Sequence, residues 1–429
     1  MQSYKVAEVF IPISRELSKL PKAQTQRSIY RVHKDLRDVN NKAYEPEIIA
    51  IGPYHRDKDN IRMMEEHKLS YLHLLLKRKK ENVETYISAV GELEQEARNC
   101  YAEPVSLNSA KFIKMLVLDS CFIIELVRKY HRIDPTCKND PIFEMVWIMN
   151  SLQRDIILFE NQIPFFILCR LFDMIEGPNR RNMLIHRLLL FCQSLYPGGR
   201  SKYKTERSLK EIKHILDLIH GDWIPSVEEV YVNVDEVPKT REWRFIHPAT
   251  ELTDANIAFK MKRDNFFKVD FDHGIMLMSP LTVEDRTECF FRNLIAYEQY
   301  FSSKTGPDFV KDYVKFLDCL INSSKDVEIL SKCRIIDNWL GDNEVVANIF
   351  NRLGVSVTGP GEHFVYATIF DSVNNHYEKR RNRAMAVLRR DYFNSPLSYF
   401  SFSAALVILL LTVAQTVLST LQLFPTSRS

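Results

Sequence analysis

Apolar side chains recur at steps of three and four residues along most of this chain, which predicts a mainly α-helical protein. The stretch 111–131 shows the pattern best, because its apolar residues return to one face over five turns. We expect helices at 61–80, 82–100, 111–131, 154–174, 183–195, 209–219, 289–301, 309–320, 327–333, 345–353 and 363–388. Pro164 must break or kink the helix at 154–174, since proline lacks the amide hydrogen that helix bonding needs.

Three stretches depart from the helical period. Residues 29–56 are interrupted by two prolines and Gly52, which predicts extended chain and turns. Valine and aromatic residues alternate with polar ones at 227–237 and again at 266–283. This period of two predicts strands or the arms of hairpins.

The end of the chain carries the most extreme apolar pattern. No side chain from Tyr392 to Ser427 is charged, and Leu397–Phe424 is almost wholly apolar. A hydrocarbon layer of about 30 Å is crossed by about 20 apolar helical residues. A buried helix of a globular core is the alternative, but such helices seldom lack charge over this length. The pattern therefore predicts a transmembrane helix at 397–424 and, because it comes last, a tail anchor.

Basic residues gather immediately before this apolar stretch. They are Lys379, Arg380, Arg381, Arg383, Arg389 and Arg390, whereas Arg428 alone follows it. Positive charge stays on the cytosolic side, partly because anionic lipid attracts each basic residue by about 1 kcal/mol near the surface. We therefore expect a single-pass protein of the plasma membrane or an endomembrane, with lipid around its closing helix and the N-terminal domain in the cytosol.

These patterns together predict three parts. Residues 1–26 carry no sustained period and form a flexible N-terminal segment. Residues 27–390 form a large multi-helix domain with minor β hairpins, and residues 397–424 form the single C-terminal transmembrane helix. The predicted fold class is mainly α.

Composition and motifs exclude several classes of function. The 429 residues hold 58 Lys and Arg against 55 Asp and Glu, so a net charge of +3 creates no field that recruits nucleic acid. The eight cysteines form no CxxC pair and no zinc-like spacing with histidine, which fits a reducing compartment. Signatures of phosphate loops, dinucleotide sites and metalloproteases are missing, so we expect no cofactor and no metal. The glycosylation triplet at Asn322 is assigned no role unless the topology is inverted.

Two carboxylates lie among apolar residues and are the candidates for chemistry. Asp119 falls on the apolar stripe of its predicted helix, and Glu160 lies between Ile156 and Ile163. Two buried carboxylates close together would push one pKa upward, and such a pair could act as general acid and base. The alternative is a structural network in which these carboxylates, Asn161, backbone amides or Arg154 satisfy one another. The lack of a nucleophile, a metal set or a ligand loop favours the network.

One face of the predicted span is polar. Thr412, Gln415, Thr416 and Ser419 lie at i, i+3, i+4 and i+7, and Ser401 and Ala405 add a pair of small residues nearer the cytosol. Interhelical hydrogen bonds contribute about 0.6–2 kcal/mol each in membranes, so this face predicts self-association or docking to another span. The alternative is that the hydroxyls bond back to carbonyls of their own helix while Gln415 stays hydrated.

Several longer segments resemble one plant family. They are IYRVHKDLR, AYEPEIIAIGPYHR, MMEEHKLSYL, FIKMLVLDSCFIIEL, DIILFENQIPFFIL, ATELTDANIAFK, TECFFRNLIAYEQ and YFNSPLSYFSFSAALVILLLTVAQT. In this order they are similar to the family catalogued as domain of unknown function 247. The family usually has proline at the position of His33 and tryptophan at that of Leu397. The resemblance implies a largely helical domain followed by one C-terminal span, and it implies no established activity.

Three functions follow as hypotheses. The leading one is a non-enzymatic membrane-anchored plant protein that contacts a protein partner in recognition or signalling. Loops such as 197–208 and 234–243 are the expected partner-facing surfaces. Some grass members of the resembling family act as pollen-side determinants of self-incompatibility, which implies a second hypothesis. The third is a hydrolase that uses Asp119 and Glu160.

Overall fold

The computed structural model describes residues 27–56, 61–131, 140–198, 212–225, 244–301, 307–355, 357, 364–379 and 396–423. The predicted segment 1–26, the strand at 227–237 and most of the two predicted partner-facing loops lie outside these residues. Of the predicted basic cluster, Lys379 is described and exposed, whereas Arg380, Arg381, Arg383, Arg389 and Arg390 lie outside.

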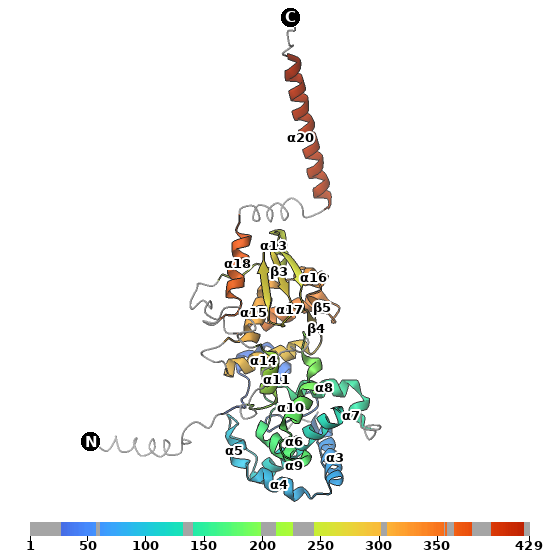
Figure 1. The fold of residues 1–429 in the computed structure, drawn as a ribbon, viewed down its shortest axis with the longest axis vertical. Helices are drawn as coiled ribbons and strands as arrows, with labels where there is room; N and C mark the ends of the chain where they lie inside the picture. Colours follow the sequence, from blue (N-terminus) through green and yellow to red (C-terminus); the bar gives the residue numbers. More distant parts are fainter. Residues whose placement is uncertain are drawn as a thin grey trace, which may run out of the picture.

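The first half of the described chain is a bundle of helices around one central helix. Its elements are α2 (Lys34–Val39), η1 (Asn41–Tyr44), α3 (Arg62–Lys79), α4 (Val83–Gly91), α5 (Glu94–Asn99), α6 (Ser109–His131), α7 (Pro141–Glu144), α8 (Val146–Ile156), α9 (Phe165–Glu176), α10 (Arg181–Phe191) and η4 (Gln193–Leu195). Helices α3, α4, α9 and α10 all pack against α6 (Figure 1). Because neighbours cover it on every side, α6 is buried from Met115 to Lys129 without a solvent face.

The second half combines helices with two small sheets. Its elements are α11 (Ile215–Trp223), α13 (Ala249–Asp254), β1 (Ala258–Met261), β2 (Val269–Asp272), β3 (Ile275–Met278), β4 (Leu281–Val283), α14 (Thr287–Phe301), α15 (Phe309–Leu320), α16 (Ser324–Lys332), β5 (Ile336–Asn338), α17 (Asn343–Leu353), α18 (Ala367–Tyr377) and α20 (Pro396–Leu423). Buried Trp223 of α11 packs against α14 and against the segment before β2. Its ring lies at centroid distances of 4.7–5.7 Å from those of Phe266, Phe267, Phe290 and Phe291.

The predicted hairpin is present within the stretch 266–283, and the sheets also contain parallel pairs. Strands β2 and β3 pair antiparallel around Gly274, whose φ of +80° a side chain would strain. Strand β1, which the sequence analysis did not predict, pairs with β3 in parallel. Strands β4 and β5 form a second parallel pair. The sheet order β1-β3-β2 leaves β2 at an edge, where α18 packs against it.

The mainly α fold class is confirmed, and the long periodic helices match their predicted ranges closely. Helices α3, α6, α14, α15 and α17 each begin within two residues of the predicted start. The predicted helix at 82–100 is divided into α4 and α5, and the one at 209–219 is displaced to α11. Within the predicted helix at 363–388, α18 covers Ala367–Tyr377, and residues 380–388 lie outside the described residues. Residues 29–56, predicted as extended, contain the short helix α2 and the turn η1 before they extend.

The helix predicted at 154–174 is broken before Phe165, as Pro164 predicted, but the break is longer than expected. Helix α8 ends at Ile156, α9 begins at Phe165, and the eight residues between them are not helical. The side-chain amide of Asn161 donates to the carbonyl of Asp155 at 2.8 Å, and that of Gln162 donates to the carbonyls of Ile156 and Leu158 at 2.7 and 2.8 Å. These local bonds replace the backbone bonds that a continuous helix would make.

Helix α20 differs from all the other helices in its surroundings. Its central stretch Phe400–Ser419 has a mean hydropathy of 2.1, and none of it is buried by the rest of the chain. Figure 1 shows α20 standing clear of the body, with α18 at the near end. Among the described residues, α20 is the one helix that is long and apolar enough to cross a membrane.

We expect Gly52→Ala to destabilise the protein strongly. Gly52 has a φ of +76°, and a Cβ there would lie 2.4 Å from the carbonyl oxygen of Gln162. Backbone strain and the clash together should lower the free energy of unfolding by about 3–5 kcal/mol. Urea unfolding of the full-length chain in detergent micelles, followed by the fluorescence of buried Trp223, measures this change.

Gly341→Ala is the matched control, because Gly341 has a φ of +81° and open space around its Cβ position. It should cost about 1 kcal/mol through strain alone. Equal losses in the two variants would contradict the close approach of residue 52 to residue 162.

Candidate functional site

A buried, extended segment runs through the helical bundle and organises the polar groups of the core. Residues 46–53 adopt neither helix nor strand, yet Ile49 and Ala50 are fully buried and Ile51 is nearly so. Buried backbone amides and carbonyls must be hydrogen-bonded. In the part of the chain that the structure describes, no neighbouring strand supplies the bonds, so side chains from α6, α8 and the loop after α8 supply them. We call Asp119, Asp155, Glu160 and Asn161, together with the segment 47–56 that they hold, the polar hub.

Asp155 holds the beginning of the segment. Its Oδ1 accepts from the amide of Glu47 at 3.0 Å, and its Oδ2 accepts from those of Ile48 and Ile49 at 2.8 and 3.1 Å. The guanidinium of Arg154 donates to the same carboxylate at 2.8 Å. Burial raises the pKa of Asp155 to about 6, although Arg154 and the three amides oppose the rise.

Asn161 and Asp119 hold the middle of the segment. The side-chain oxygen of Asn161 accepts from the amide of Ile51 at 2.7 Å, while its nitrogen donates to the carbonyl of Ile49 at 3.0 Å. The next amide, that of Gly52, donates to Oδ2 of Asp119 at 2.9 Å. Each backbone amide from Glu47 to Ile49, and those of Ile51 and Gly52, thus has a side-chain acceptor.

Asp119 is neutralised by two cations. Nζ of Lys68 lies 2.7 Å from Oδ1 of Asp119, and Nη1 of Arg56 lies 3.0 Å from its Oδ2. Lys68 is fully buried, and its ammonium also donates to the carbonyl of Ala50 at 2.5 Å and to Glu65 at 2.6 Å. A buried lysine stays charged only when acceptors replace water around it, and here three acceptors do so.

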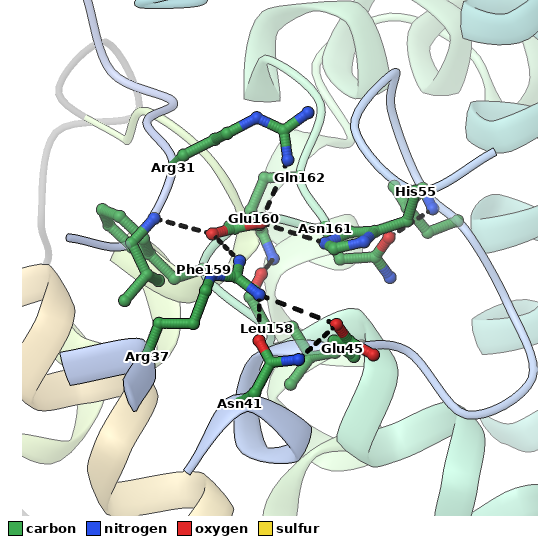
Figure 2. A network of polar contacts seen from close by, with 12 residues as sticks. Arg31, Arg37, Asn41, Glu45, His55, Leu158, Phe159, Glu160, Asn161 and Gln162 are labelled. Atoms are coloured by element: carbon green, nitrogen blue, oxygen red, sulfur yellow. Dashed lines mark hydrogen bonds and ion pairs between the residues drawn. The ribbon is translucent and has the colours of Figure 1, made fainter. Parts of the chain in front are cut away.

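Glu160 occupies a second cluster of cations, shown in Figure 2. Its Oε1 accepts from the amide of Val32 at 2.7 Å and from the guanidinium of Arg37. Its Oε2 lies 3.2 Å from Nε2 of His55 and 3.6 Å from Nη1 of Arg31. Burial raises the pKa of Glu160, but the close contact with His55, the charge of Arg37 and the hydrogen bond from the amide of Val32 outweigh it, so its pKa is lowered.

The structure places the two predicted carboxylates in separate clusters of one hub. His55 contacts Glu160, and the next residue, Arg56, contacts Asp119. Both carboxylates are fully buried, and within the described residues no hydrogen bond joins them directly. Arg154, which the sequence analysis named as a partner for them, bonds Asp155 instead.

Sequence reasoning missed Asp155, Lys68 and His55. Lys68 gave a readable signal, because it stands on the inward stripe of α3 four residues after Met64 and four before Leu72. A lysine at such a position requires a buried anion. Asp155 was not singled out, and its neighbour Arg154 was assigned instead to the network of Asp119 and Glu160.

Histidines on α11 form a smaller buried cluster beside the hub. Nδ1 of His214 accepts from the amide of Asp217 at 3.2 Å and so caps the helix. Burial lowers the pKa of His214 to about 4, helped by Lys213 and opposed by Asp217. Further along α11, Nε2 of His220 lies 2.9 Å from Oε1 of Glu298.

The remaining predicted features are placed as follows. On α20 the hydroxyls of Thr412 and Thr416 donate to the carbonyls of Ile408 and Thr412, each at 2.8 Å. Among the described residues no group of three or more His, Cys, Asp and Glu side chains could hold a metal ion. The seven described cysteines are all free thiols.

Comparison with known proteins identifies the family. The model of the family domain of unknown function 247, described as a plant protein of unknown function, matches residues 29–411. The chain belongs to this family. It is 30% identical over 417 residues to UPF0481 protein At3g47200 of Arabidopsis thaliana, covering 92% of this chain and 86% of the relative. It is 24% identical over 485 residues to UPF0481 protein At3g02645 of the same plant, covering 90% and 89%. No solved structure matches the chain.

Three of the segments by which the chain resembles domain of unknown function 247 meet at the polar hub. AYEPEIIAIGPYHR is the extended segment, FIKMLVLDSCFIIEL carries Asp119, and DIILFENQIPFFIL carries Asp155, Glu160 and Asn161. In this member of the family, these three sequence segments therefore build one buried hydrogen-bonded structure.

We expect Asp119→Asn to destabilise the fold, because it removes the carboxylate that pairs with the buried charge of Lys68 and the partly buried charge of Arg56. Breaking a buried pair on one side costs about 3–5 kcal/mol. Urea unfolding of the full-length chain in micelles measures the loss. Removing the lysine charge as well, in Asp119→Asn/Lys68→Met, should recover part of it.

Glu103→Gln is the matched control for that experiment. Glu103 also pairs with an arginine, Arg31, but 52% of its side chain is exposed. Removing an exposed pair should change the free energy of unfolding by at most ~1 kcal/mol. A loss in Asp119→Asn no larger than in this control would contradict a buried, charged hub.

We expect His214 to make the stability fall as the pH falls below neutrality. Its folded pKa of about 4 lies below the ordinary histidine value of 6.5, so between these values the unfolded chain binds the proton more readily. The stabilisation from neutral His214 is complete above pH 6.5 and should fall by about 2 kcal/mol between pH 7 and pH 5. Denaturant unfolding at several pH values measures this slope.

His214→Asn keeps a residue that caps helices and should lose that part of the slope. His273→Asn is the control, because His273 is 90% exposed and asparagine tolerates its positive φ of 47°. Identical pH slopes in the wild type and His214→Asn would disprove the assignment.

Proposed function

We propose that this chain is a single-pass membrane protein whose helical domain lies in the cytosol and makes non-catalytic contacts with other proteins. The observation that carries the proposal is the complete exposure of Phe400–Ser419. Leucines such as Leu409, Leu410 and Leu411 are each at least 60% exposed there. A core helix would be covered by its own protein, whereas lipid covers a transmembrane helix. Twenty residues of helix span about 30 Å, the thickness of the hydrocarbon layer.

The contacts of the hub support a structural role for the candidate carboxylates. Asp119 and Glu160 are fully buried, and each is bound by a backbone amide and by cations of the same chain. A general acid or base must reach the proton of a substrate. A structural role therefore explains Asp119 and Glu160 better than hydrolysis does. The amides and cations that bind these carboxylates stabilise the helical bundle, whose outer surface would contact a partner.

Exposed aromatic residues of the domain support contacts with a protein partner. Val146 and Trp147 begin α8 with 74% and 58% of their surface exposed, and Trp339 is 69% exposed after β5. Tryptophan is enriched at protein interfaces, where its large ring contributes much of the affinity. Basic residues before α20, of which Lys379 is described and exposed, support the cytosolic orientation.

We expect the full-length chain, translated with endoplasmic-reticulum microsomes, to stay with the vesicles after extraction with alkaline carbonate. A variant that lacks 397–424 should be released, because no apolar segment of sufficient length then remains among the described residues. Recovery of the full-length chain in the carbonate supernatant would refute the anchor.

The glycosylation triplet at Asn322 tests the orientation in the same experiment. Asn322 is exposed in the turn between α15 and α16, so a luminal enzyme would reach it. We expect no shift on endoglycosidase H for the native chain, whereas an acceptor triplet added after Ser429 should be glycosylated. A shift that Asn322→Gln abolishes would show that the domain is luminal.

A further inference from the structure

We propose that α20 pairs with α20 of a second copy of this chain through a seam that contains Gln415. The seam consists of Ser401, Ala405, Ile408, Thr412, Gln415 and Ser419. Its residues follow one another at steps of 4, 3, 4, 3 and 4, which is the heptad spacing of a left-handed helix pair. The inference rests on the membrane anchor proposed above.

The seam differs chemically from the opposite face of α20. The seam carries small and polar side chains at five of its six positions, and the exception is Ile408. The opposite face consists of Ser403, Val407, Leu410, Ala414 and Val417, and it carries no amide. Its larger side chains are the apolar Val407, Leu410 and Val417, which are 55%, 60% and 51% exposed. Small side chains let two helix backbones approach closely, whereas leucine and valine suit contact with lipid. The two faces therefore suit two different neighbours.

Hydrogen bonding within α20 singles out Gln415. The hydroxyls of Thr412 and Thr416 are satisfied by carbonyls one turn earlier, as the alternative interpretation of this face expected. Within the described residues the side-chain amide of Gln415 makes no hydrogen bond, although it lies inside the apolar stretch Phe400–Ser419. An amide surrounded by hydrocarbon costs several kcal/mol without a partner, on the order of 4–8 for complete transfer. A partner must come from outside the helix.

A second copy supplies that partner at the required depth. All copies insert with the same orientation, so two α20 helices lie parallel and each seam residue meets its own counterpart. A glutamine side chain contains both a donor and an acceptor, so two Gln415 side chains satisfy each other. A polar residue at one seam position also sets register and favours a pair over larger assemblies.

Single cysteines on the two faces test the seam. Wild-type α20 contains no cysteine, so Ile408→Cys places one thiol on the seam and Leu410→Cys places one on the opposite face at nearly the same depth. Oxidation of the full-length variants in microsomes should give disulfide-linked dimers for Ile408→Cys and only the background of the wild type for Leu410→Cys. Equal dimer yields from the two variants would overturn the proposal.

Adding Gln415→Leu to Ile408→Cys tests the amide. The association constant should fall roughly three- to thirtyfold, which is the effect of losing one interhelical hydrogen bond of the usual strength in a membrane. Gln415→Asn, which keeps the amide group, should retain most of the dimer. A dimer yield unchanged by Gln415→Leu would overturn the role of Gln415.

Carbonate extraction of the same samples separates this proposal from the anchor on which it depends. Chains that remain in the vesicles but show no preference between positions 408 and 410 would overturn the seam alone. Chains that wash out would overturn the anchor and, with it, the seam. Reversal of the preference, with Leu410→Cys linking better, would place the pairing on the apolar face and also overturn the proposal.

Discussion

The fold depends on one requirement, that the buried amides of an unpaired extended segment find acceptors. Residues 47–52 cross the core without a neighbouring strand, and Asp155, Asn161 and Asp119 accept from them in turn. Carboxylates are strong acceptors, but burying their charge is costly unless cations accompany it. Lys68 and Arg56 meet this need for Asp119. The requirement of the backbone thus fixes the relative positions of α3, α6 and α8, because each contributes a charged side chain to the same hub.

The sequence predicted those elements whose stability comes from a repeating apolar face. Helices α6, α14, α15 and α17 have enough turns for the period to be unambiguous. The loop between α8 and α9 has the apolar residues of a helix. Pro164 ends the loop, and the side-chain bonds of Asn161 and Gln162 accompany its irregular path from Ile157 onward. Whether such residues bond the local backbone or point outward depends on the surrounding fold, so the periodic pattern alone predicted a helix there. The parallel pairing of β1 with β3 was equally hidden, since a strand does not encode the direction of its neighbour.

The candidate site was visible in part for a similar reason. Asp119 was noticed because a carboxylate on an apolar stripe contradicts the simple pattern, and Lys68 contradicts it in the same way on α3. Two opposite charges on inward faces imply a buried pair. Their pairing could have been proposed from sequence if both had been considered together. The contact of Glu160 with Val32, Arg37 and His55 could not, because these residues come from turns whose path is set by the whole bundle.

Polar groups away from water need hydrogen-bond partners both in the body and in α20, but the two parts meet this need differently. Inside the body, every hub carboxylate meets groups that the fold brings from distant parts of the sequence. An isolated helix has only its own carbonyls to offer, and these suffice for the short side chains of Thr412 and Thr416. The side-chain amide of Gln415 makes no hydrogen bond within the described residues, and no neighbouring element of the described chain covers it. On the membrane anchor proposed above, Gln415 lies away from water, and the pairing that we propose gives its amide a partner. A second copy presents an identical amide at the same depth on a parallel helix, so the proposal requires no additional protein.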